Sequence, residues 1–292
     1  LRGPWRRRCE IYPTRGCARI VAGVCRHWTS LYAVEPLIRT DTPPNSAALG
    51  VGTAFAFELT TARMVVLGYW DIRGLAEPIR YLLAHVGVPF EDKRYGFGDG
   101  PEPSRDEWLA VKYKLDLDFP NVPYLIDGDV RMTQSQAILR YLGRKHGLAP
   151  KDEETVRRVD QLEHQSADVL WSSVRLCYDP DYTEEKRCQF LVDIADKLKQ
   201  FEAYLKKYGP FGAGKSVTYV DFHLYETLQV IKTLGPSTFR KGYPTLVEYC
   251  DRVAALPGLK EYLASDRFKA WPFWSPYAKA LAAQNKPPAD DC

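Results

Sequence analysis

Residues 64–87 read MVVLGYWDIRGLAEPIRYLLAHVG, and this stretch decides the fold class of the chain. Residues 64–70 form a short apolar run of strand length. After a turn at residues 71–74, apolar side chains return at the spacing of one helix face and end at a glycine. These positions are Leu75, Ile79, Leu82, Leu83 and Val86, with Gly87 at the end. The stretch therefore predicts a strand, a tight turn and an amphipathic helix.

The next residues continue this alternation of strand and helix. Residues 90–95 alternate like a strand, and residues 96–104 (GFGDGPEPS) form a loop rich in Gly and Pro. Ser104 is followed by Glu107 three positions later, which is the pattern of a capping box. It predicts a helix that starts after Ser104 and carries Trp108, Val111 and Leu115.

A hairpin and a further helix complete the first domain. Residues 122–127 and 130–133 predict two strands joined by a tight turn. Ser135 starts a helix that ends near Gly147. The order of strand, helix, strand, helix, two strands and helix predicts a compact α/β domain with a small mixed sheet, over residues 64–150.

Strand patterns vanish after the break at residues 149–151. Thr218 and Asp221 form a capping box at the start of one of the helical stretches that follow. The long amphipathic stretches cover residues 152–178, 184–208, 219–234 and 244–264. They predict an all-helical domain over residues 152–280, followed by a C-terminal tail at 281–292.

Residues 1–63 differ from the rest in charge. They hold nine Arg, no Lys and four acidic residues, a net charge of +5, whereas residues 64–292 carry −2. The Arg-rich composition resembles a transit peptide, but residues 41–45 (DTPPN) would break an amphipathic helix. We therefore interpret residues 1–63 as an extension, disordered or non-native, before a natural start at Met64. The remainder offers no basic field that would attract nucleic acid.

Composition excludes several other classes of protein. With 45% apolar and 26% charged residues, the chain is globular. No apolar run approaches the ~20 residues that cross a bilayer, so we expect no membrane partner. The five histidines show no metal-ligand spacing, so we expect no metal. Four widely spaced cysteines predict free thiols in a reducing compartment, and these are Cys177, Cys188, Cys250 and Cys292.

Three longer motifs resemble a known family. They are GYWDIRGLAEPIRYLL (68–83), LDFPNVPYLIDGD (117–129) and TQSQAILRYLGRKH (133–146). In this order and spacing they resemble the cytosolic glutathione transferases, and the mu class in particular, as does the long loop at 96–104. The resemblance covers residues 64–280. It implies a thioredoxin-like domain followed by an all-helical domain, in a cytoplasmic homodimer that uses reduced glutathione as co-substrate and has no prosthetic group.

Tyr69 is the candidate catalytic residue. The thiol of glutathione is mostly protonated at neutral pH, because its pKa lies near the ~8.5 of a free cysteine. An enzyme that uses this sulfur as a nucleophile must stabilise the thiolate, which a hydroxyl can do by donating a hydrogen bond. The resemblance assigns this role to Tyr69, at the end of the first strand. The alternative is a tyrosine that only packs at a strand end.

The resemblance also implies a set of glutathione-binding residues. The backbone of Val122, before a cis Pro123, pairs with the peptide of the glutathione cysteine, although the mu pattern more often has leucine there. Ser135, at a helix start, meets the γ-glutamyl carboxylate, unless it only caps the helix. Trp108 and Lys112 share a helix face near the glycyl carboxylate, unless the lysine stem only packs on the ring. The full set is Tyr69, Trp70, Arg105, Trp108, Lys112, Asn121, Val122, Pro123, Gln134, Ser135 and Asp168.

Other matched positions concern the second substrate and the dimer. The hydroxyl of Tyr178 assists addition to electrophiles, and Asp168 reaches the glutathione of the neighbouring subunit. Phe119 resembles an aromatic key that inserts between helices of that subunit, which removes an exposed apolar ring from water. The predicted walls of the electrophile pocket are Trp70, Ile72, Leu75, Tyr178, Phe273 and Trp274.

Two functions follow from these residues. The first is an enzyme that conjugates the glutathione thiolate to electrophilic, mostly hydrophobic substrates in detoxification. The alternative is a non-catalytic binding or structural protein of the same fold, as lens crystallins and some translation-factor subunits are. The presence of Tyr69 together with the binding set favours the enzyme.

Overall fold

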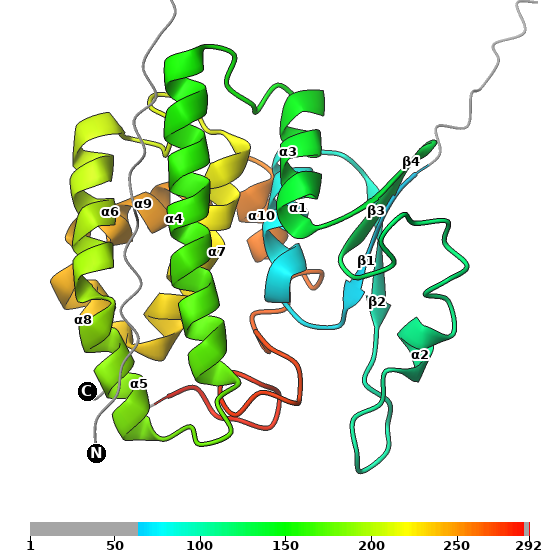
Figure 1. The fold of residues 1–292 in the computed structure, drawn as a ribbon. Helices are drawn as coiled ribbons and strands as arrows, with labels where there is room; N and C mark the ends of the chain where they lie inside the picture. The colour runs from blue at the N-terminus through cyan, green and yellow to red at the C-terminus, as the bar shows by residue number, and fades with distance from the viewer. Residues whose placement is uncertain (1–63, 289–291) are drawn as a thin grey trace, which may run out of the picture. The chain divides into compact units, whose positions relative to one another are not determined.

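A four-stranded mixed sheet forms the first part of the fold (Figure 1). The computed structural model describes residues 64–288 and 292. The strands are β1 (Val65–Trp70), β2 (Phe90–Tyr95), β3 (Tyr124–Asp127) and β4 (Val130–Thr133). Their order is β2-β1-β3-β4, with β1 parallel to β2 and antiparallel to β3. The predicted mixed sheet is confirmed. The interpretation of residues 1–63 as an extension lies outside the described residues.

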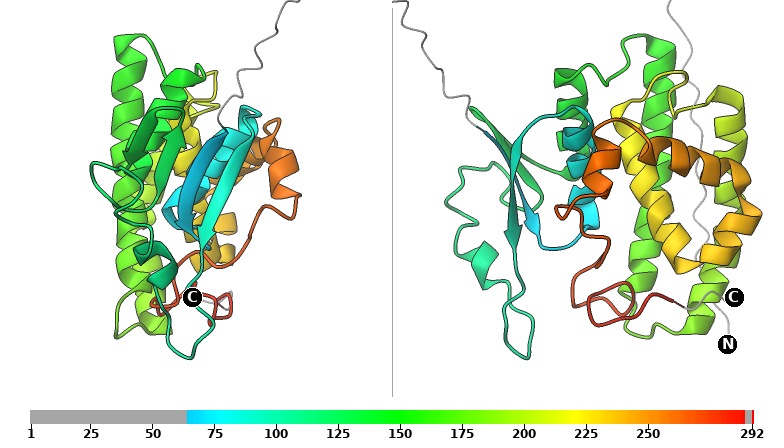
Figure 2. Two further views of the ribbon diagram at one scale, coloured as in Figure 1. Left: turned by 90° about the vertical axis from the view of Figure 1, so that its right-hand side faces the viewer. Right: turned by 180° about the vertical axis from the view of Figure 1, so that it is seen from behind.

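Helices cover both faces of this sheet. They are η1 (Gly74–Ala76), α1 (Glu77–His85), α2 (Asp106–Leu109) and α3 (Ser135–Lys145). Figure 2 (right) shows α1 and α3 between the sheet and the remaining helices, with α2 on the opposite side. Parallel strands need such a crossover, so η1 and α1 connect β1 to β2.

Seven further helices follow in the described part of the chain, where the helical spacing predicted four long stretches. They are α4 (Glu153–Cys177), α5 (Glu184–Asp193), α6 (Ala195–Tyr208), α7 (Tyr219–Leu234), α8 (Pro236–Gly242), α9 (Pro244–Ala254) and α10 (Leu259–Leu263). α7 packs against α4, α1, α3 and α9, so it forms the centre of the core. The predicted capping box at its start is confirmed, with Thr218 and Asp221 each bonded to the other's backbone. No helix of the described residues could span a membrane.

Some helix boundaries differ from the predictions. Residues 184–208 form two helices that meet at Ile194, and residues 244–264 also form two, with Gly258 at a φ of +74° between them. The helix after Ser104 has only one turn, and its predicted capping box is wrong. The Glu107 carboxylate instead accepts the N–H of Gly96 at 2.8 Å, so it ties down the preceding loop.

The prediction of four free thiols is wrong for two of the cysteines. Cys188 of α5 and Cys292 form a disulfide, although they are 104 residues apart in the sequence. Cys177 and Cys250 are free and buried. The C-terminal segment returns to the helical part and packs Leu281 and Ala282 into the core, which sequence spacing cannot show.

The segment after α10 also contacts the sheet domain. The N–H groups of Arg73 and Gly74 donate to the carbonyls of Pro272 and Phe273, at 3.0 and 2.9 Å. The Arg73 guanidinium binds Glu226 of α7 through two hydrogen bonds of 3.1 and 2.5 Å. These contacts hold the turn after β1 against the helical part, and this turn positions Tyr69.

Candidate functional site

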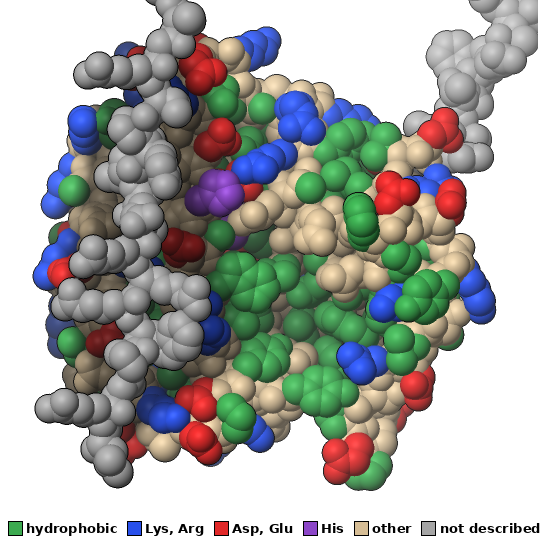
Figure 3. Space-filling model, in the orientation of Figure 1, with side chains coloured by type: hydrophobic (Ala, Val, Ile, Leu, Met, Phe, Trp, Pro, Cys, Tyr) green, Lys and Arg blue, Asp and Glu red, His purple; other side chains and the backbone are tan. Residues whose placement is uncertain are grey.

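Tyr69 lies at an apolar cavity of about 280 Å³ between β1, α4 and the C-terminal segment. Figure 3 shows hydrophobic side chains gathered between α4 and the strands on this side of the molecule. The cavity is lined by Tyr69, Trp70, Ile72, Leu75, Trp171, Val174, Tyr178, Trp274 and Ser275. The structure therefore brings together Tyr69 and five of the six predicted wall residues.

The phenol of Tyr69 is set up as a hydrogen-bond donor. Burial raises its pKa to about 12, while the N–H of Leu75, which donates to the phenol oxygen at 3.1 Å, acts in the opposite direction. The phenol therefore keeps its proton at neutral pH. Because the oxygen already accepts from Leu75, the O–H is free to donate to a second group.

Gly74 makes this arrangement possible. A Cβ at this residue would lie 2.6 Å from the hydroxyl of Tyr69, and its φ is +49°. Both features favour glycine, because other residues rarely adopt this backbone conformation. The turn that the sequence predicted at residues 71–74 thus brings the N–H of Leu75 against the phenol.

A second, more polar cavity of about 440 Å³ lies beside the first, and Leu75 and Trp171 line both. It is lined by Leu75, Asn121, Val122, Pro123, Gln134, Ser135, Gln136, Ala137, Arg140, Leu170, Trp171 and His223. Five of these residues belong to the predicted glutathione set: Asn121, Val122, Pro123, Gln134 and Ser135. An elongated ligand could therefore place one end here and the other near Tyr69.

The backbone at this polar cavity has unusual geometry. The Val122–Pro123 peptide bond is cis, as the resemblance implied, and the Val122 N–H donates to the Asn121 side chain at 2.9 Å. A ligand carbonyl must replace the Asn121 side chain to accept the N–H of Val122. Gln134 has a φ of 73°, a strained conformation that is concentrated at functional sites.

The start of α3 faces this cavity without a side-chain cap. Ser135 is the first helical residue and not the cap, and Gln134 makes no capping bond either. The alternative that Ser135 only caps the helix is therefore wrong. Its half-buried hydroxyl and the first N–H groups of α3 are available to an anion.

The remaining predicted glutathione contacts lie outside the lining of both cavities. Trp108 is buried on the other face of the sheet, stacked on Tyr124 at a ring distance of 6.0 Å. Arg105 is exposed, and the Lys112 ammonium lies 5.2 Å from the ring of Tyr113. The structure thus shows a packing role for Trp108 and no shared cavity with Ser135.

Of two aromatic residues predicted for the electrophile pocket, one lines the apolar cavity and the other does not. The Tyr178 hydroxyl lies at the apolar cavity, 2.8 Å from the Ser275 hydroxyl. Phe273 is buried beneath the Arg73 guanidinium, 3.9 Å from ring centre to carbon, and does not line the cavity. Its role is therefore in packing the C-terminal segment.

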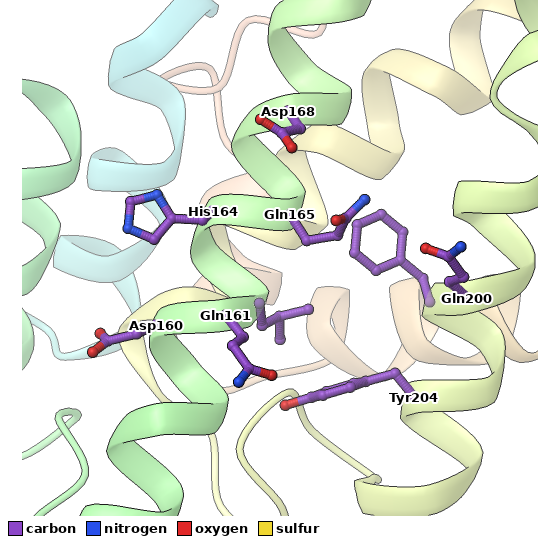
Figure 4. A pocket seen from close by; sticks show the side chains of 9 residues that line it. Asp160, Gln161, His164, Gln165, Asp168, Gln200 and Tyr204 are labelled. Carbon is purple, nitrogen blue, oxygen red and sulfur yellow. The ribbon is translucent and has the colours of Figure 1, made fainter. Parts of the chain in front are cut away.

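Asp168 lies in a third cavity, of about 550 Å³, between α4 and α6. Figure 4 shows Gln165 and Tyr204 pointing into this space, whereas Asp160 and His164 point away from it. Asp168 is exposed there, outside both cavities near Tyr69. Phe119 is 73% exposed on a loop of the sheet domain.

The sequence interpretation missed several lining residues. Trp171, Val174 and Ser275 line the apolar cavity, and Leu170 and His223 line the polar one. Trp171 carried a usable signal, because a large aromatic ring on a polar helix face suggests a contact. Among the described residues, no cluster of His, Cys, Asp and Glu could hold a metal ion.

Comparison with known proteins identifies the family. The family model described as "Glutathione S-transferase, N-terminal domain" matches residues 65–144. The model described as "Glutathione S-transferase, C-terminal domain" matches residues 167–266. Among solved structures, the glutathione S-transferase Blo t 8 is 40% identical with a TM-score of 0.66, over 73% of this chain and 98% of that one. The Pi-class enzyme of Onchocerca volvulus is 30% identical with a TM-score of 0.64, over 73% and 99%.

Curated relatives are closer in sequence. Glutathione S-transferase Mu 3 of Homo sapiens is 45% identical over 71% of this chain and 91% of its own length. Glutathione S-transferase B of Cavia porcellus is 44% identical, over 73% and 97%. These matches cover both the sheet domain and the helical domain that form the two cavities. The chain belongs to the glutathione S-transferase family.

Proposed function

We propose that this glutathione transferase joins the thiolate of reduced glutathione to hydrophobic electrophiles, with Tyr69 as the group that stabilises the thiolate. The observation that carries the proposal is the position of the Tyr69 phenol, at an apolar cavity that shares Leu75 and Trp171 with a polar one. Glutathione binds in the polar cavity and extends its sulfur toward Tyr69. The electrophile binds in the apolar cavity.

The chemistry needs a donor that stays protonated. The Tyr69 O–H donates to the glutathione sulfur and favours its charged form, because a hydrogen bond to an ionised acceptor is worth about 1.5–3 kcal/mol. The thiolate then attacks the electrophilic carbon, forms the carbon–sulfur bond and displaces the leaving group. Tyr69 gives up no proton in this step, in accord with its pKa of about 12.

The start of α3 holds the γ-glutamyl carboxylate. The uncapped N–H groups of α3 and the Ser135 hydroxyl suit a carboxylate, and the nearby backbone of Val122 suits the peptide of the glutathione cysteine. We assign Arg105, Trp108 and Lys112 to the glycyl end by resemblance alone.

Two assays on the full chain test the activity. Retention on immobilised glutathione together with conjugation of a chlorodinitrobenzene substrate supports the enzyme. Retention without conjugation supports the non-catalytic alternative, and no retention contradicts both. For localisation, the resemblance favours the cytoplasm, which a tagged chain would test.

We further propose a homodimer in which Phe119 inserts into the cavity between α4 and α6 of a second copy. The exposed ring would bury roughly 150 Å² or more, and the cavity of about 550 Å³ has room for it. In such a dimer, Asp168 on the rim of this cavity approaches the glutathione of the other subunit.

Truncating Phe119 tests the dimer. Phe119→Ala should reduce the free energy of dimer association by about 3–5 kcal/mol, the cost of truncating a core phenylalanine. The dissociation constant of the dimer should therefore rise by about two to four decades. Analytical ultracentrifugation measures the shift, and glutathione affinity should fall most at low protein concentration. Val192→Ala, which truncates another exposed side chain, is the matched control. An intact Phe119→Ala dimer would refute the assignment.

A further inference from the structure

Leu75 and Trp171 line both the polar and the apolar cavity. Leu75 belongs to η1, after the first strand, and Trp171 belongs to α4 of the helical part. These two side chains therefore border the place where the two cavities meet. In the proposed function, the glutathione sulfur extends from the polar cavity toward Tyr69, so sulfur and electrophile come together beside Trp171.

The side chain of Trp171 is accessible in this position. It is 46% exposed, and Val174 and Tyr178 follow it on the same face of α4 and line the apolar cavity with it. A half-exposed indole leaves apolar surface in water, and covering that surface with a ligand is favourable. An electrophile in the apolar cavity can therefore gain binding energy by contacting Trp171.

Trp171 differs from other aromatic residues of this cavity in having no aromatic partner. Trp70 is stacked on Phe97 at a ring distance of 4.9 Å, and Tyr178 meets Trp274 edge to face at 6.4 Å. Within the part of the chain that the structure describes, no aromatic ring pairs with Trp171. Trp171 thus offers a ring with which a ligand ring can pair.

A flat ring that carries electron-withdrawing groups suits this place. The face of an indole is electron-rich, and aromatic pairs prefer contacts in which a negative face meets a positive region. Nitro groups withdraw electrons from a ring, so a nitro-substituted ring stacks favourably on the indole. The same withdrawal makes a ring carbon electrophilic: the thiolate forms the carbon–sulfur bond, and a halide leaves with the electron pair of the carbon–halogen bond.

We propose that Trp171 is a specificity-determining residue that stacks on flat, electron-poor aromatic electrophiles and so favours them over flexible aliphatic ones. This inference rests on the proposed conjugation of glutathione in these two cavities. It assigns Trp171 no proton transfer and no part in stabilising the thiolate, which is the role of Tyr69.

Two glutathione conjugates that differ only in the group on sulfur test the stacking. Trp171→Leu keeps an apolar side chain but removes the ring. It should weaken binding of S-dinitrophenylglutathione by about two- to tenfold, the range for one aromatic pair. Binding of S-hexylglutathione and of glutathione itself should not change, and Trp171→Phe, which restores a ring, should recover most of the affinity. Calorimetry on the full chain gives these affinities.

Kinetics with two electrophiles test the same selectivity during turnover. In Trp171→Leu, the KM for chlorodinitrobenzene should rise by about two- to tenfold, whereas the KM for iodohexane, an aliphatic electrophile, should not change. The pKa of the bound thiol should also stay the same, because Tyr69 is intact. A general disturbance of the site would change all three quantities.

Val174→Ala is the matched control, because Val174 lines the apolar cavity from the same face of α4 and carries no ring. It should weaken both conjugates alike and leave the ratio of their affinities unchanged. Unchanged affinity for S-dinitrophenylglutathione in Trp171→Leu, or an equal loss for both conjugates, would overturn this inference alone. Failure of the original chain to bind glutathione or to conjugate either electrophile would overturn the proposed function as well.

Discussion

Two polar side chains one turn apart on α7 have opposite surroundings. Glu226 pairs with the buried Arg73 and accepts the Tyr81 hydroxyl at 2.9 Å. His223, on the same helix, lines a cavity, and no group of the described residues bonds its buried Nε2. Glu226 is therefore satisfied where the two domains meet directly, whereas Nε2 of His223 is left without a partner among the described residues, which is rare for a buried polar atom.

Breaking the paired region should have the largest effect. Arg73→Met leaves Glu226 buried without its cation. Removing one partner of a buried ion pair typically costs about 3–5 kcal/mol, so the free energy of unfolding should fall by about that amount. Burial already raises the pKa of Glu226 to about 7. Urea unfolding of the variant measures the loss. The double variant Arg73→Met/Glu226→Gln removes the charge and should recover much of it; a double variant as unstable as the single one would contradict the pairing argument.

The burial of neutral His223 should make the free energy of unfolding fall in acid. Its pKa is about 4 when folded and 6.5 otherwise, so below pH 6.5 the unfolded chain binds more protons. The free energy of unfolding therefore falls as pH drops from 6.5 to 4, by up to about 3 kcal/mol from this residue. In His223→Leu that contribution is absent, so the variant should gain on the original chain toward pH 4. Parallel unfolding curves at all pH values would contradict the burial of a neutral ring.

At the catalytic end of the site, Tyr69→Phe should raise the pKa of the thiol of bound glutathione by about one to two units. Difference absorbance of the thiolate and the pH–rate profile measure it. Stability should fall by about 0.5–1.5 kcal/mol, because the N–H of Leu75 loses its acceptor. Tyr95→Phe, which removes a buried hydroxyl from the far side of the same sheet, is the control. An unchanged profile in Tyr69→Phe would remove Tyr69 from the mechanism.

The smallest effect concerns the uncapped helix. Ser135→Ala should weaken glutathione binding by about two- to tenfold with unchanged stability, because Ser135 caps nothing. Thr183→Ala gives the opposite pattern. Its hydroxyl accepts the Lys186 N–H at 3.2 Å and caps α5, so stability falls by about 1 kcal/mol and binding stays the same. A stability loss in Ser135→Ala would show that the serine acts as a cap.

Local patterns predicted most of the sheet domain. Alternation and helical spacing over residues 64–95 predicted β1, α1 and β2, because these elements carry their apolar faces in the sequence itself. The capping box at Thr218 was equally readable, since both partners are three residues apart. The capping box predicted for Ser104 and Glu107 was wrong, because Glu107 bonds the N–H of Gly96 and not its own helix start.

The sequence by itself determined the order of elements, the apolar faces that pack and the motif around Tyr69, because those depend on neighbours a few residues apart. Tertiary structure alone decided the environment of each side chain. It buried Phe273 under Arg73, joined Cys188 to Cys292 and placed His223 in the lining of a cavity. Each of these contacts joins residues far apart in the chain, and the partner of a buried polar group is set by where the folded backbone brings it.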